Sequence, residues 1–329
     1  MATDKLWDTQ MPLITILMAV YEPRRDWLRV QLQSLNAQTY PRLRLYIRDD
    51  CSSKIPFADI EEIVGECITA FPYTIVQNEK NLGSNGTFEL LTREAMGDLF
   101  AYCDQDDEWL PEKLVVLQRE MSQSGALLVC SDMFVMDGDG KTVAGSITKV
   151  RRHHVFRSGE KLAPGLLFRN FVTGCTMLMD AKTAKAAVPF CPYYVHDHYL
   201  ALWCAERGYI VSILQPLIRY RIHSENQTGL MVGVYNKKSY GTVRIDTSLK
   251  RLAWLQKNFP CAGETLRAIE DGLTWVEARK SSWLHQGGME TVWKYRFFNP
   301  WVSAAELCMK YVPEWLFQWA VRLASENKV

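Results

Sequence analysis

Hydrophobic and polar positions in the first third of the chain follow two alternating patterns. One pattern is the short apolar run that is typical of a buried strand, and it occurs at residues 12–21, 43–50, 73–78 and 99–104. The other is the helical spacing of apolar residues, and it occurs at residues 26–38, 58–70 and 85–95. Strands that alternate with helices in this way predict βαβ units and an α/β fold with a mostly parallel sheet.

The same patterns continue more loosely to about residue 230 and then change. Further strands are predicted at 126–137 and 173–180, one or two strands at 209–223, and a helix at 196–207. After about residue 233 the apolar residues recur only at helical spacing, and Trp, Lys and Arg become frequent. We therefore expect an α/β domain over residues 1–230 and a helical extension over residues 231–329.

Composition and charge narrow the class of protein. The chain has 329 residues, of which 48% are hydrophobic and 23% charged, as in a folded globular protein. Its 38 basic and 37 acidic residues leave a net charge of +1, which argues against a bulk nucleic-acid binder. The nine cysteines form no CxxC pair, so we interpret them as buried reduced thiols rather than zinc ligands.

No secretory pattern precedes residue 12, and no apolar run approaches the roughly 20 residues of a membrane-spanning helix. We therefore expect a cytoplasmic protein. Peripheral contact with the inner face of the plasma membrane is an open alternative.

Three carboxylates directly follow the apolar run at 99–103, in the stretch CDQDDEWLPEKL. They are Asp104, Asp106 and Asp107. In an extended backbone alternate side chains project the same way, so Asp104 and Asp106 would crowd their charges. A hard divalent cation such as Mg²⁺ or Mn²⁺ relieves this repulsion and commonly shares its site with substrate phosphates. For Asp107 two interpretations are equally good: a member of this cation site, or the N-cap of the next helix.

Two further polar stretches follow strands of the same predicted sheet. In IRDDCSS, Asp49 and Asp50 can accept hydrogen bonds from a base or a ribose, although the stretch is also a good turn. In NLGSNGTF, Gly83 would let the backbone approach a ligand, and Asn85 is a candidate cap of a helix whose N-terminus faces phosphate. A plain loop is the alternative there. Ligands of such sheets bind beyond the carboxyl ends of the strands, so we predict one acidic site at this edge.

The order of these pieces resembles the family-2 inverting glycosyltransferases with the GT-A fold, which use nucleotide-sugar donors. The matching pieces are VYEP (20–23), QSLNAQTYP (33–41), DDCSS (49–53), NLGSNGTF (81–88), CDQDDEWLPEKL (103–114), TGC (173–175), HDHYLALWCAERG (196–208) and YRIHSENQTG (220–229). The resemblance implies a nucleotide-sugar half at about 12–115 and an acceptor half at about 116–230. The CDQDDEW and YRIHSENQTG pieces look most like bacterial rhamnosyltransferases of surface-polysaccharide (O-antigen or capsule) synthesis.

The resemblance also implies roles for individual residues. The nucleotide sugar would be bound by Val20, Tyr21, Glu22, Asp49, Asp50, Asn81, Gly83, Asn85, Asp104, Gln105 and Arg221. The metal ligands would be Asp104, Asp106 and His223, with a simple surface or core histidine as the alternative for His223. Arg219 and Arg221 alternate on a predicted strand, so one of them can face phosphate, while a solvated surface position stays open for each.

Asp197, between His196 and His198, matches the acidic residue that serves as catalytic base. An inverting transfer needs a base on the acceptor hydroxyl and a cation on the departing diphosphate, so this assignment agrees with the chemistry. The alternative is that Asp197 is a helix N-cap. The flanking imidazoles are candidates for tuning or orienting it.

Two features depart from the family pattern. Cys51 replaces the glycine of the frequent DDGS, so we expect a turn of different shape there. The QxxRW signature of the family's processive polymer synthases is missing, as are their membrane spans, which favours an enzyme that adds one sugar or a short chain.

At the end of the chain, apolar residues again recur at helical spacing. They are Trp315, Leu316, Trp319, Ala320 and Leu323. Three interpretations are open: a helix packed on the catalytic domain, an interfacial helix whose aromatic side chains enter lipid head groups, and a homodimer contact.

The sequence as a whole predicts metal-dependent inverting transfer of a sugar to a glycan or lipid-linked glycan acceptor. The donor that it favours is dTDP-rhamnose, which would supply L-rhamnose. One alternative is the same mechanism with UDP-glucose, UDP-galactose or UDP-N-acetylglucosamine as donor. Another is a catalytically inactive partner of a transferase complex. An aspartyl-phosphate phosphatase is disfavoured, because Glu108 stands where that motif wants Thr or Val.

Overall fold

The computed structural model describes residues 11–151, 153–223 and 233–326. The chain divides into two compact units, the first made of Met1–Lys161 and Asn170–Ile222 and the second of Leu162–Arg169 and His223–Val329. The first unit ends eight residues before the predicted boundary at 230, and residues 162–169 join the second unit.

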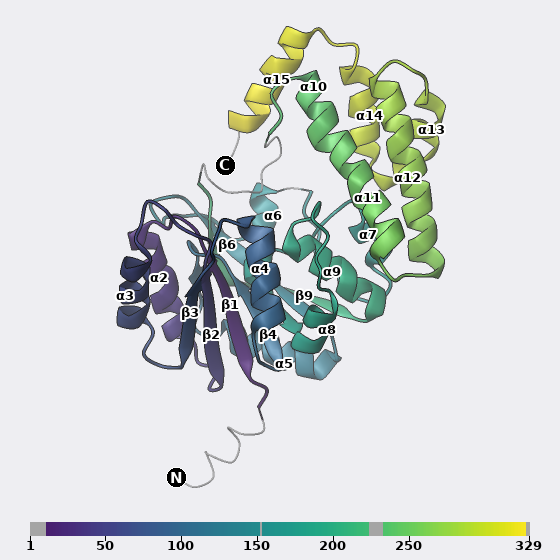
Figure 1. Cartoon of the computed structure of the whole chain (residues 1–329). Helices are drawn as coiled ribbons and strands as arrows, with labels where there is room; N and C mark the ends of the chain where they lie inside the picture. Colours follow the sequence, from purple (N-terminus) through teal and green to yellow (C-terminus); the bar gives the residue numbers. More distant parts are fainter. Residues whose placement is uncertain (1–10, 152, 224–232, 327–329) are drawn as a thin grey trace. The chain divides into compact units, whose positions relative to one another are not determined.

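The first unit is built on a nine-stranded sheet of order β3-β2-β1-β4-β8-β6-β9-β5, with β7 paired to β6 (Figure 1). The strands are β1 (Ile14–Val20), β2 (Leu43–Asp49), β3 (Tyr73–Gln77), β4 (Leu99–Cys103), β5 (Glu108–Trp109), β6 (Leu128–Met136), β7 (Thr142–Ala144), β8 (Met177–Asp180) and β9 (Ile210–Arg221). Strands β1 to β4 pair in parallel, as predicted. Strand β8 pairs antiparallel with both β4 and β6, so the complete sheet is mixed.

Helices cover both faces of this sheet. Those of the first unit are α2 (Arg25–Asn36), α3 (Phe57–Cys67), α4 (Gly83–Glu94), α5 (Lys113–Ser124), α6 (Ile147–Val150), α8 (Ala181–Ala186) and α9 (His196–Arg207), with the 3₁₀ helix η1 at Gly174–Thr176. Alternate residues of β4 face opposite sides. Ala101 and Cys103 join a core with residues of α2, α3 and α5. Tyr102 faces the other side, where its ring centroid lies 5.7 Å from that of Phe88 of α4.

The second unit is helical, as the sequence predicts. Its helices are α7 (Ala163–Leu166), α10 (Lys237–Tyr240), α11 (Thr247–Asn258), α12 (Gly263–Trp283), α13 (Met289–Lys294), α14 (Pro300–Met309) and α15 (Glu314–Glu326), with the π-helix η2 at Gly241–Asp246 and the 3₁₀ helix η3 at Arg296–Phe298. A buried ion pair joins α12 to α14, since Arg279 donates to the two Glu306 carboxylate oxygens at 2.8 and 2.6 Å. This two-pronged geometry fixes both side chains and satisfies their charges away from water.

Helix α15 packs within its own unit through residues other than the predicted stripe. Phe317 and Val321 are buried in a small cluster with Val234. Trp315, Trp319 and Leu323 of the predicted stripe are instead 69%, 56% and 39% exposed. Within the described ranges, no helix is long and apolar enough to cross a membrane. Cytoplasmic location, membrane-surface contact and dimerisation stay predictions.

Candidate active site

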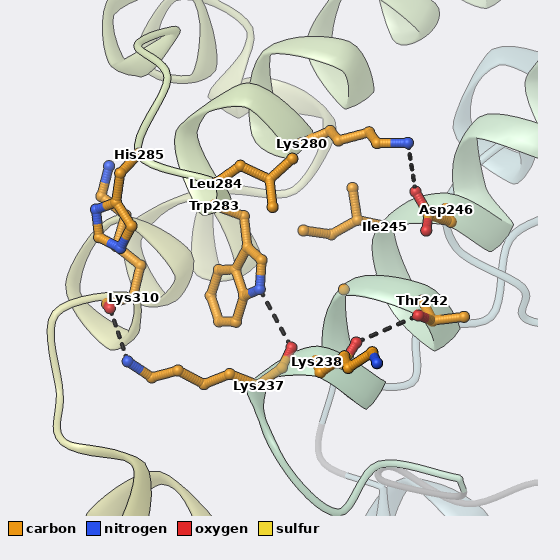
Figure 2. Close-up of a pocket in the computed structure, with 11 residues that line it drawn as sticks. Lys237, Lys238, Thr242, Ile245, Asp246, Lys280, Trp283, Leu284, His285 and Lys310 are labelled. Atoms are coloured by element: carbon orange, nitrogen blue, oxygen red, sulfur yellow. Dashed lines mark hydrogen bonds and ion pairs between the residues drawn. The ribbon is translucent and has the colours of Figure 1, made fainter.

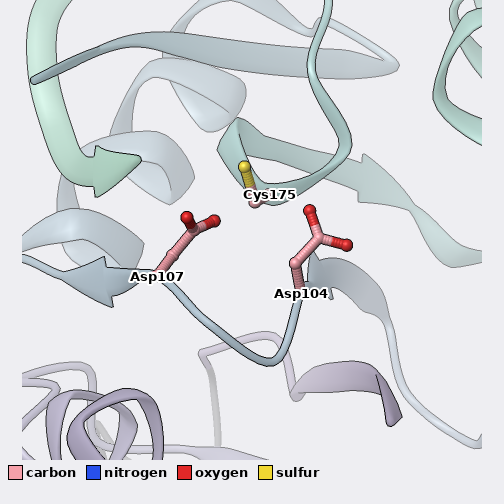
Figure 3. A group of neighbouring side chains, drawn as sticks. All are labelled: Asp104, Asp107 and Cys175. Atoms are coloured by element: carbon pink, nitrogen blue, oxygen red, sulfur yellow. The ribbon is translucent and has the colours of Figure 1, made fainter. Parts of the chain in front are cut away.

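The acidic stretch after β4 lies where two antiparallel strands bring distant residues together. Ala101 of β4 is paired with Leu178 of β8, so the residues just before β8 lie beside the carboxyl end of β4. This pairing places Cys175 next to Asp104. Ligand atoms of Asp104, Asp107 and Cys175 all lie within 4.8 Å of one another (Figure 3). The sequence analysis included Cys175 only as part of the TGC piece and gave it no role, because only the strand pairing brings it beside Asp104.

Asp107 is fully buried and is not a helix cap. Its Oδ1 accepts the backbone N–H of Arg221 at 2.9 Å, and its Oδ2 has no hydrogen-bond partner within residues 11–151, 153–223 and 233–326. Burial raises the pKa of Asp107 well above its usual range. Helix α5 begins at Lys113 with Glu112 in the N-cap position, so the N-cap interpretation of Asp107 is wrong.

Asp104 has the electrostatics expected of a cation ligand. It is half-buried, and burial together with the nearby charges of Asp106 and Asp197 raises its pKa to about 7. A hard divalent cation would relieve this repulsion, and carboxylate oxygens are the ligands that such ions prefer. The residues present therefore fit a divalent metal ion.

Arg221 supports the acidic stretch rather than standing open to solvent. The side chain is buried, with Nε donating to the backbone O of Asp106 at 2.8 Å and Nη1 donating to the backbone O of Asp137 and Gly138 at 3.2 and 3.1 Å. These bonds tie β9 to the stretch between β4 and β5. The side chain of Arg219, by contrast, is 42% exposed and pairs with Glu108 at 3.6 Å. Arg219 thus occupies the solvated surface position that was the alternative for each arginine. A contact of Arg221 with the nucleotide stays a prediction.

Lys113 is a site residue that the sequence analysis missed. It is fully buried, its Nζ donates to the backbone O of Cys175 at 2.5 Å, and the same Nζ lies 3.0 Å from the Trp109 ring centroid. Burial lowers the pKa of Lys113 to about 7. The hydrogen bond fixes the Cys175 segment to α5. Lys113 belongs to the CDQDDEWLPEKL piece, but the sequence analysis gave it no role, because a lysine at a helix start is ordinary.

Asp197 lies in the first turn of α9, and hydrogen bonds hold its carboxylate in place. Its Oδ2 accepts the backbone N–H of Gly174 at 3.0 Å and its Oδ1 accepts Nδ2 of Asn170 at 3.3 Å. The N-cap of α9 is Val195, so the N-cap interpretation of Asp197 is wrong. Burial raises the pKa of Asp197 to about 6. Because its charge also raises the pKa of Asp104, the two carboxylates belong to one electrostatic site.

The flanking histidines have packing roles. The His196 ring stacks on Phe88 with centroids 4.0 Å apart, and burial lowers its pKa to about 3, so it is neutral. His198 packs edge-on against Tyr194 at 4.6 Å. A Cβ at Gly174 would lie only 2.7 Å from the His196 Nε2, which explains why a glycine stands beside Asp197.

Asp49 and Asp50, predicted to hold the base, are buried and bonded to protein donors. Asp49 Oδ2 accepts the backbone N–H of Ser52 at 3.0 Å and Nε2 of Gln77 at 2.8 Å. Asp50 accepts the backbone N–H groups of Leu82 and Gly83, both at 2.8 Å. These contacts shape the edge of the sheet beyond β2. Direct contact of either carboxylate with a base stays a prediction.

Asp50 therefore caps α4, and Asn85 does not. Helix α4 begins at Gly83, whose φ of 73° is the left-handed conformation that favours glycine. Asn85 lies inside the helix, and its Nδ2 donates to the backbone O of Cys191 at 3.4 Å. The expected cap at Asn85 is wrong, because the carboxylate of Asp50 already fills the helix N-terminus. Asn81 is exposed, and its Oδ1 accepts the N–H of Gly83 at 3.1 Å.

Gln105 links the acidic stretch to the segment after β1. Its Oε1 accepts the N–H of Tyr21 at 2.8 Å, and its Nε2 donates to the Tyr21 backbone O at 3.0 Å. Tyr21 is 47% exposed. The backbone O of Val20 accepts the N–H of Asp50 at 2.7 Å. These bonds hold the ends of β1, β2 and β4 as one surface.

Glu22 and Cys51 shape the neighbouring turn. Glu22 Oε1 accepts the backbone N–H groups of Ser53 and Lys54 at 2.8 and 3.1 Å, and these bonds lower its pKa. Cys51 has a φ of 61°, so it adopts the left-handed conformation that glycine favours. The backbone thus keeps a glycine-type turn despite the cysteine.

His223, the third predicted metal ligand, is partly exposed and belongs to the residues of the second unit. Its contact with a metal stays a prediction. Residues 224–229 of the YRIHSENQTG stretch lie outside the described residues.

Comparisons of sequence identify the family of this chain. Residues 15–184, slightly more than half of the chain, match glycosyl transferase family 2. An uncharacterized glycosyltransferase of Haemophilus influenzae is 32% identical over 101 residues, and the match covers 31% of this chain and 32% of that protein. The chain thus spans about a third of that relative's length. A second uncharacterized glycosyltransferase of the same organism is 23% identical over 247 residues, covering 71% of each protein.

Solved structures share the fold. S. aureus TarS superposes with a TM-score of 0.57 at 12% identity, covering 96% of this chain and 54% of the TarS chain. TarS 1-349 in complex with UDP-GlcNAc gives 0.56 at 15% identity, covering 96% and 89%. The mannosyltransferase PcManGT from Pyrobaculum calidifontis, in complex with GDP-Man and Mn²⁺, gives 0.54 at 14% identity, covering 98% and 88%. The match over residues 15–184 and this shared fold establish that the chain belongs to glycosyl transferase family 2 and has the mixed α/β GT-A fold.

Proposed function

We propose that this chain transfers a sugar, with inversion at the anomeric carbon, from a nucleoside-diphosphate sugar to a glycan or lipid-linked glycan acceptor in bacterial surface-polysaccharide synthesis. The observation that carries the proposal is the electrostatic coupling of Asp104 and Asp197. Asp104 lies just beyond β4 and Asp197 at the start of α9, and each carboxyl group has a raised pKa. One carboxylate for a metal and a second for a proton are what an inverting transfer requires.

In this mechanism the acidic stretch and Asp197 have separate tasks. Asp104 and Asp106 would hold Mg²⁺ or Mn²⁺, which when bound neutralises the diphosphate leaving group. Asp197 would accept the proton of the acceptor hydroxyl. The Gly174 N–H and the Asn170 amide hold the Asp197 carboxylate in place, so it is oriented before the acceptor binds.

For the donor we propose dTDP-L-rhamnose, on the resemblance of CDQDDEW and YRIHSENQTG to bacterial rhamnosyltransferases. A UDP-sugar is the second candidate, and the UDP-GlcNAc complex of TarS 1-349 favours it. The intact Asp104, Asp106 and Asp197 argue against a catalytically inactive partner.

A thermal-shift panel tests donor class and metal dependence together. Purified protein is heated with dTDP, UDP, GDP or CMP, each with and without Mn²⁺. A nucleotide at a hundred times its Kd should raise the free energy of unfolding by about 2.7 kcal/mol. We expect the largest stabilisation with dTDP and only in the presence of Mn²⁺. A metal-dependent response to UDP alone would keep the mechanism and change the donor, whereas no response to any nucleotide would contradict the proposal.

The pH dependence of turnover tests the role of Asp197. As a base it must be ionised, and its pKa of about 6 means that the reactive carboxylate is lost as the pH falls through about 6. We expect kcat in the donor-saturated enzyme to rise with pH around this value and then level off. Donor affinity measured over the same range is the control. If affinity and kcat fall together on the acid side, protonation of Asp104 explains the profile and Asp197 is not the titrating base.

A further inference from the structure

A pocket of about 330 Å³ lies within the second unit, and none of the residues of the site described above lines it (Figure 2). Its apolar wall is formed by Ile245, Trp283 and Leu284. Four lysines also line it, and they are Lys237, Lys238, Lys280 and Lys310. The volume falls at the lower end of the range of small-ligand sites, roughly 300 to 1,000 Å³.

The charges around this pocket are unbalanced. Asp246 is the one carboxylate among the described lining residues, and it pairs with Lys280 at 2.9 Å. Lys237 Nζ donates instead to the backbone O of Lys310 at 2.7 Å. Glu314 accepts the backbone N–H of Lys237 at 3.1 Å. In the part of the chain that the structure describes, no carboxylate forms an ion pair with the ammonium group of Lys237, Lys238 or Lys310. The pocket therefore has an excess of positive charge.

Lys310 is the strongest sign that an anion belongs here. The residue is only 4% exposed, and its Nζ donates to the backbone O and the Oγ of Ser282 at 3.2 and 2.8 Å. Both acceptors are neutral. A buried ammonium without a counter-charge costs free energy, and an anion in the adjoining pocket would offset that cost.

The wall of the pocket is held in shape before any ligand arrives. The Trp283 Nε1 donates to the backbone O of Lys237 at 3.2 Å, and the Tyr240 ring packs on it with centroids 4.8 Å apart. The neighbouring segment Gly241–Asp246 is a π-helix, a rare form that is found frequently at functional sites.

We propose that this lysine pocket is a second anion site, which binds a phosphate or diphosphate group through Lys238, Lys280 and Lys310 with Trp283 along one side. It goes beyond the proposed transfer, because all its residues belong to the second unit. A soluble phosphorylated compound and a phosphorylated lipid head group would present the same chemistry.

The test uses the full chain with EDTA present, so that metal-dependent donor binding does not contribute. Inorganic pyrophosphate is titrated calorimetrically into wild type, into the double variant Lys238→Gln/Lys280→Gln, and into the control Lys257→Gln/Lys294→Gln. The control removes the same charge from exposed positions of the same unit. We expect the pocket variant to bind at least tenfold more weakly and the control to bind like wild type. Absence of binding by wild type, or equal loss in both variants, would overturn the proposal.

Two further variants are tested in the same pyrophosphate titration. Asp246→Asn removes the competing carboxylate and should bind pyrophosphate more tightly than wild type, an effect that misfolding cannot produce. Weaker binding by this variant would count against the site. Asp106→Ala should bind pyrophosphate normally here, so a failure at the pocket is separable from a failure of the proposed transfer.

The source of the phosphate is resolved by flotation with phosphatidylcholine vesicles, with or without phosphatidic acid. Flotation only with phosphatidic acid, lost in the pocket variant and competed by pyrophosphate, would support a lipid head group. Pyrophosphate binding without flotation would support a soluble ligand. Flotation that the pocket variant retains would show that the vesicles do not use this site, and would overturn the lipid arm.

Discussion

Asp197→Asn is expected to lower turnover by about 10²- to 10⁴-fold with little change in donor affinity. The asparagine keeps the size of the side chain and one oxygen for the Gly174 N–H, which donates to Asp197 at 3.0 Å. It cannot accept a proton from the acceptor. The measurement is kcat under saturating donor, with equilibrium donor binding followed in parallel.

A matched variant separates base catalysis from a general effect of losing a carboxylate. Asp180→Asn changes a partly buried aspartate of the same unit, whose Oδ1 accepts the N–H of Thr183 at the start of α8. Turnover should survive that change. If Asp197→Asn is as active as Asp180→Asn, the base has been assigned to the wrong residue.

Asp106→Ala should weaken metal-dependent donor binding by at least about 10²-fold, since even indirect partners of a metal site typically contribute 10- to 100-fold. Asp106 is partly exposed, unlike the fully buried Asp107, and so remains accessible to a metal that also contacts a diphosphate. Removing its charge also removes one cause of the raised pKa of Asp104. The measurement is donor affinity with and without Mn²⁺.

The structure supplies a rival metal site as the control for that experiment. Asp104, Asp107 and Cys175 gather within 4.8 Å, with Asp106 outside the group. If the ion used this deeper group, Cys175→Ser would abolish the effect of Mn²⁺ while Asp106→Ala would leave it unchanged. We expect the opposite pattern, because Asp107 is buried with a strongly raised pKa and would have to give up a proton in a site away from water.

Local sequence determined the alternation of β1 to β4 with α2 to α4. The period of apolar residues is a property of consecutive positions, because strand side chains alternate and helical ones repeat every 3.6 residues. The same reasoning placed Asp104 at the end of a strand and Asp197 at the start of a helix, where the structure has them. Their roles in catalysis stay predictions.

The sequence-based predictions were wrong or incomplete where a residue's contact partner is distant along the chain. Asn85 resembled a helix cap, but Asp50, more than thirty residues earlier, fills the N-terminus of α4. Lys113 looked like any lysine at a helix start, yet its ammonium reaches the backbone of Cys175, 62 residues away. Neither contact has a periodic signal, because each depends on which strands are neighbours in the sheet.

The helical unit shows most clearly which features follow from local sequence and which depend on tertiary contacts. The sequence by itself determined that the residues after 233 form helices and that Trp315, Trp319 and Leu323 share one side of the last of them. Only the tertiary structure decided that this side is exposed and that Phe317 and Val321 are the packed residues. It also gathered four lysines from three separate segments around one pocket. Periodicity defines the faces of a helix, but the choice of the face to be buried depends on the shape and charge of the surfaces that surround it.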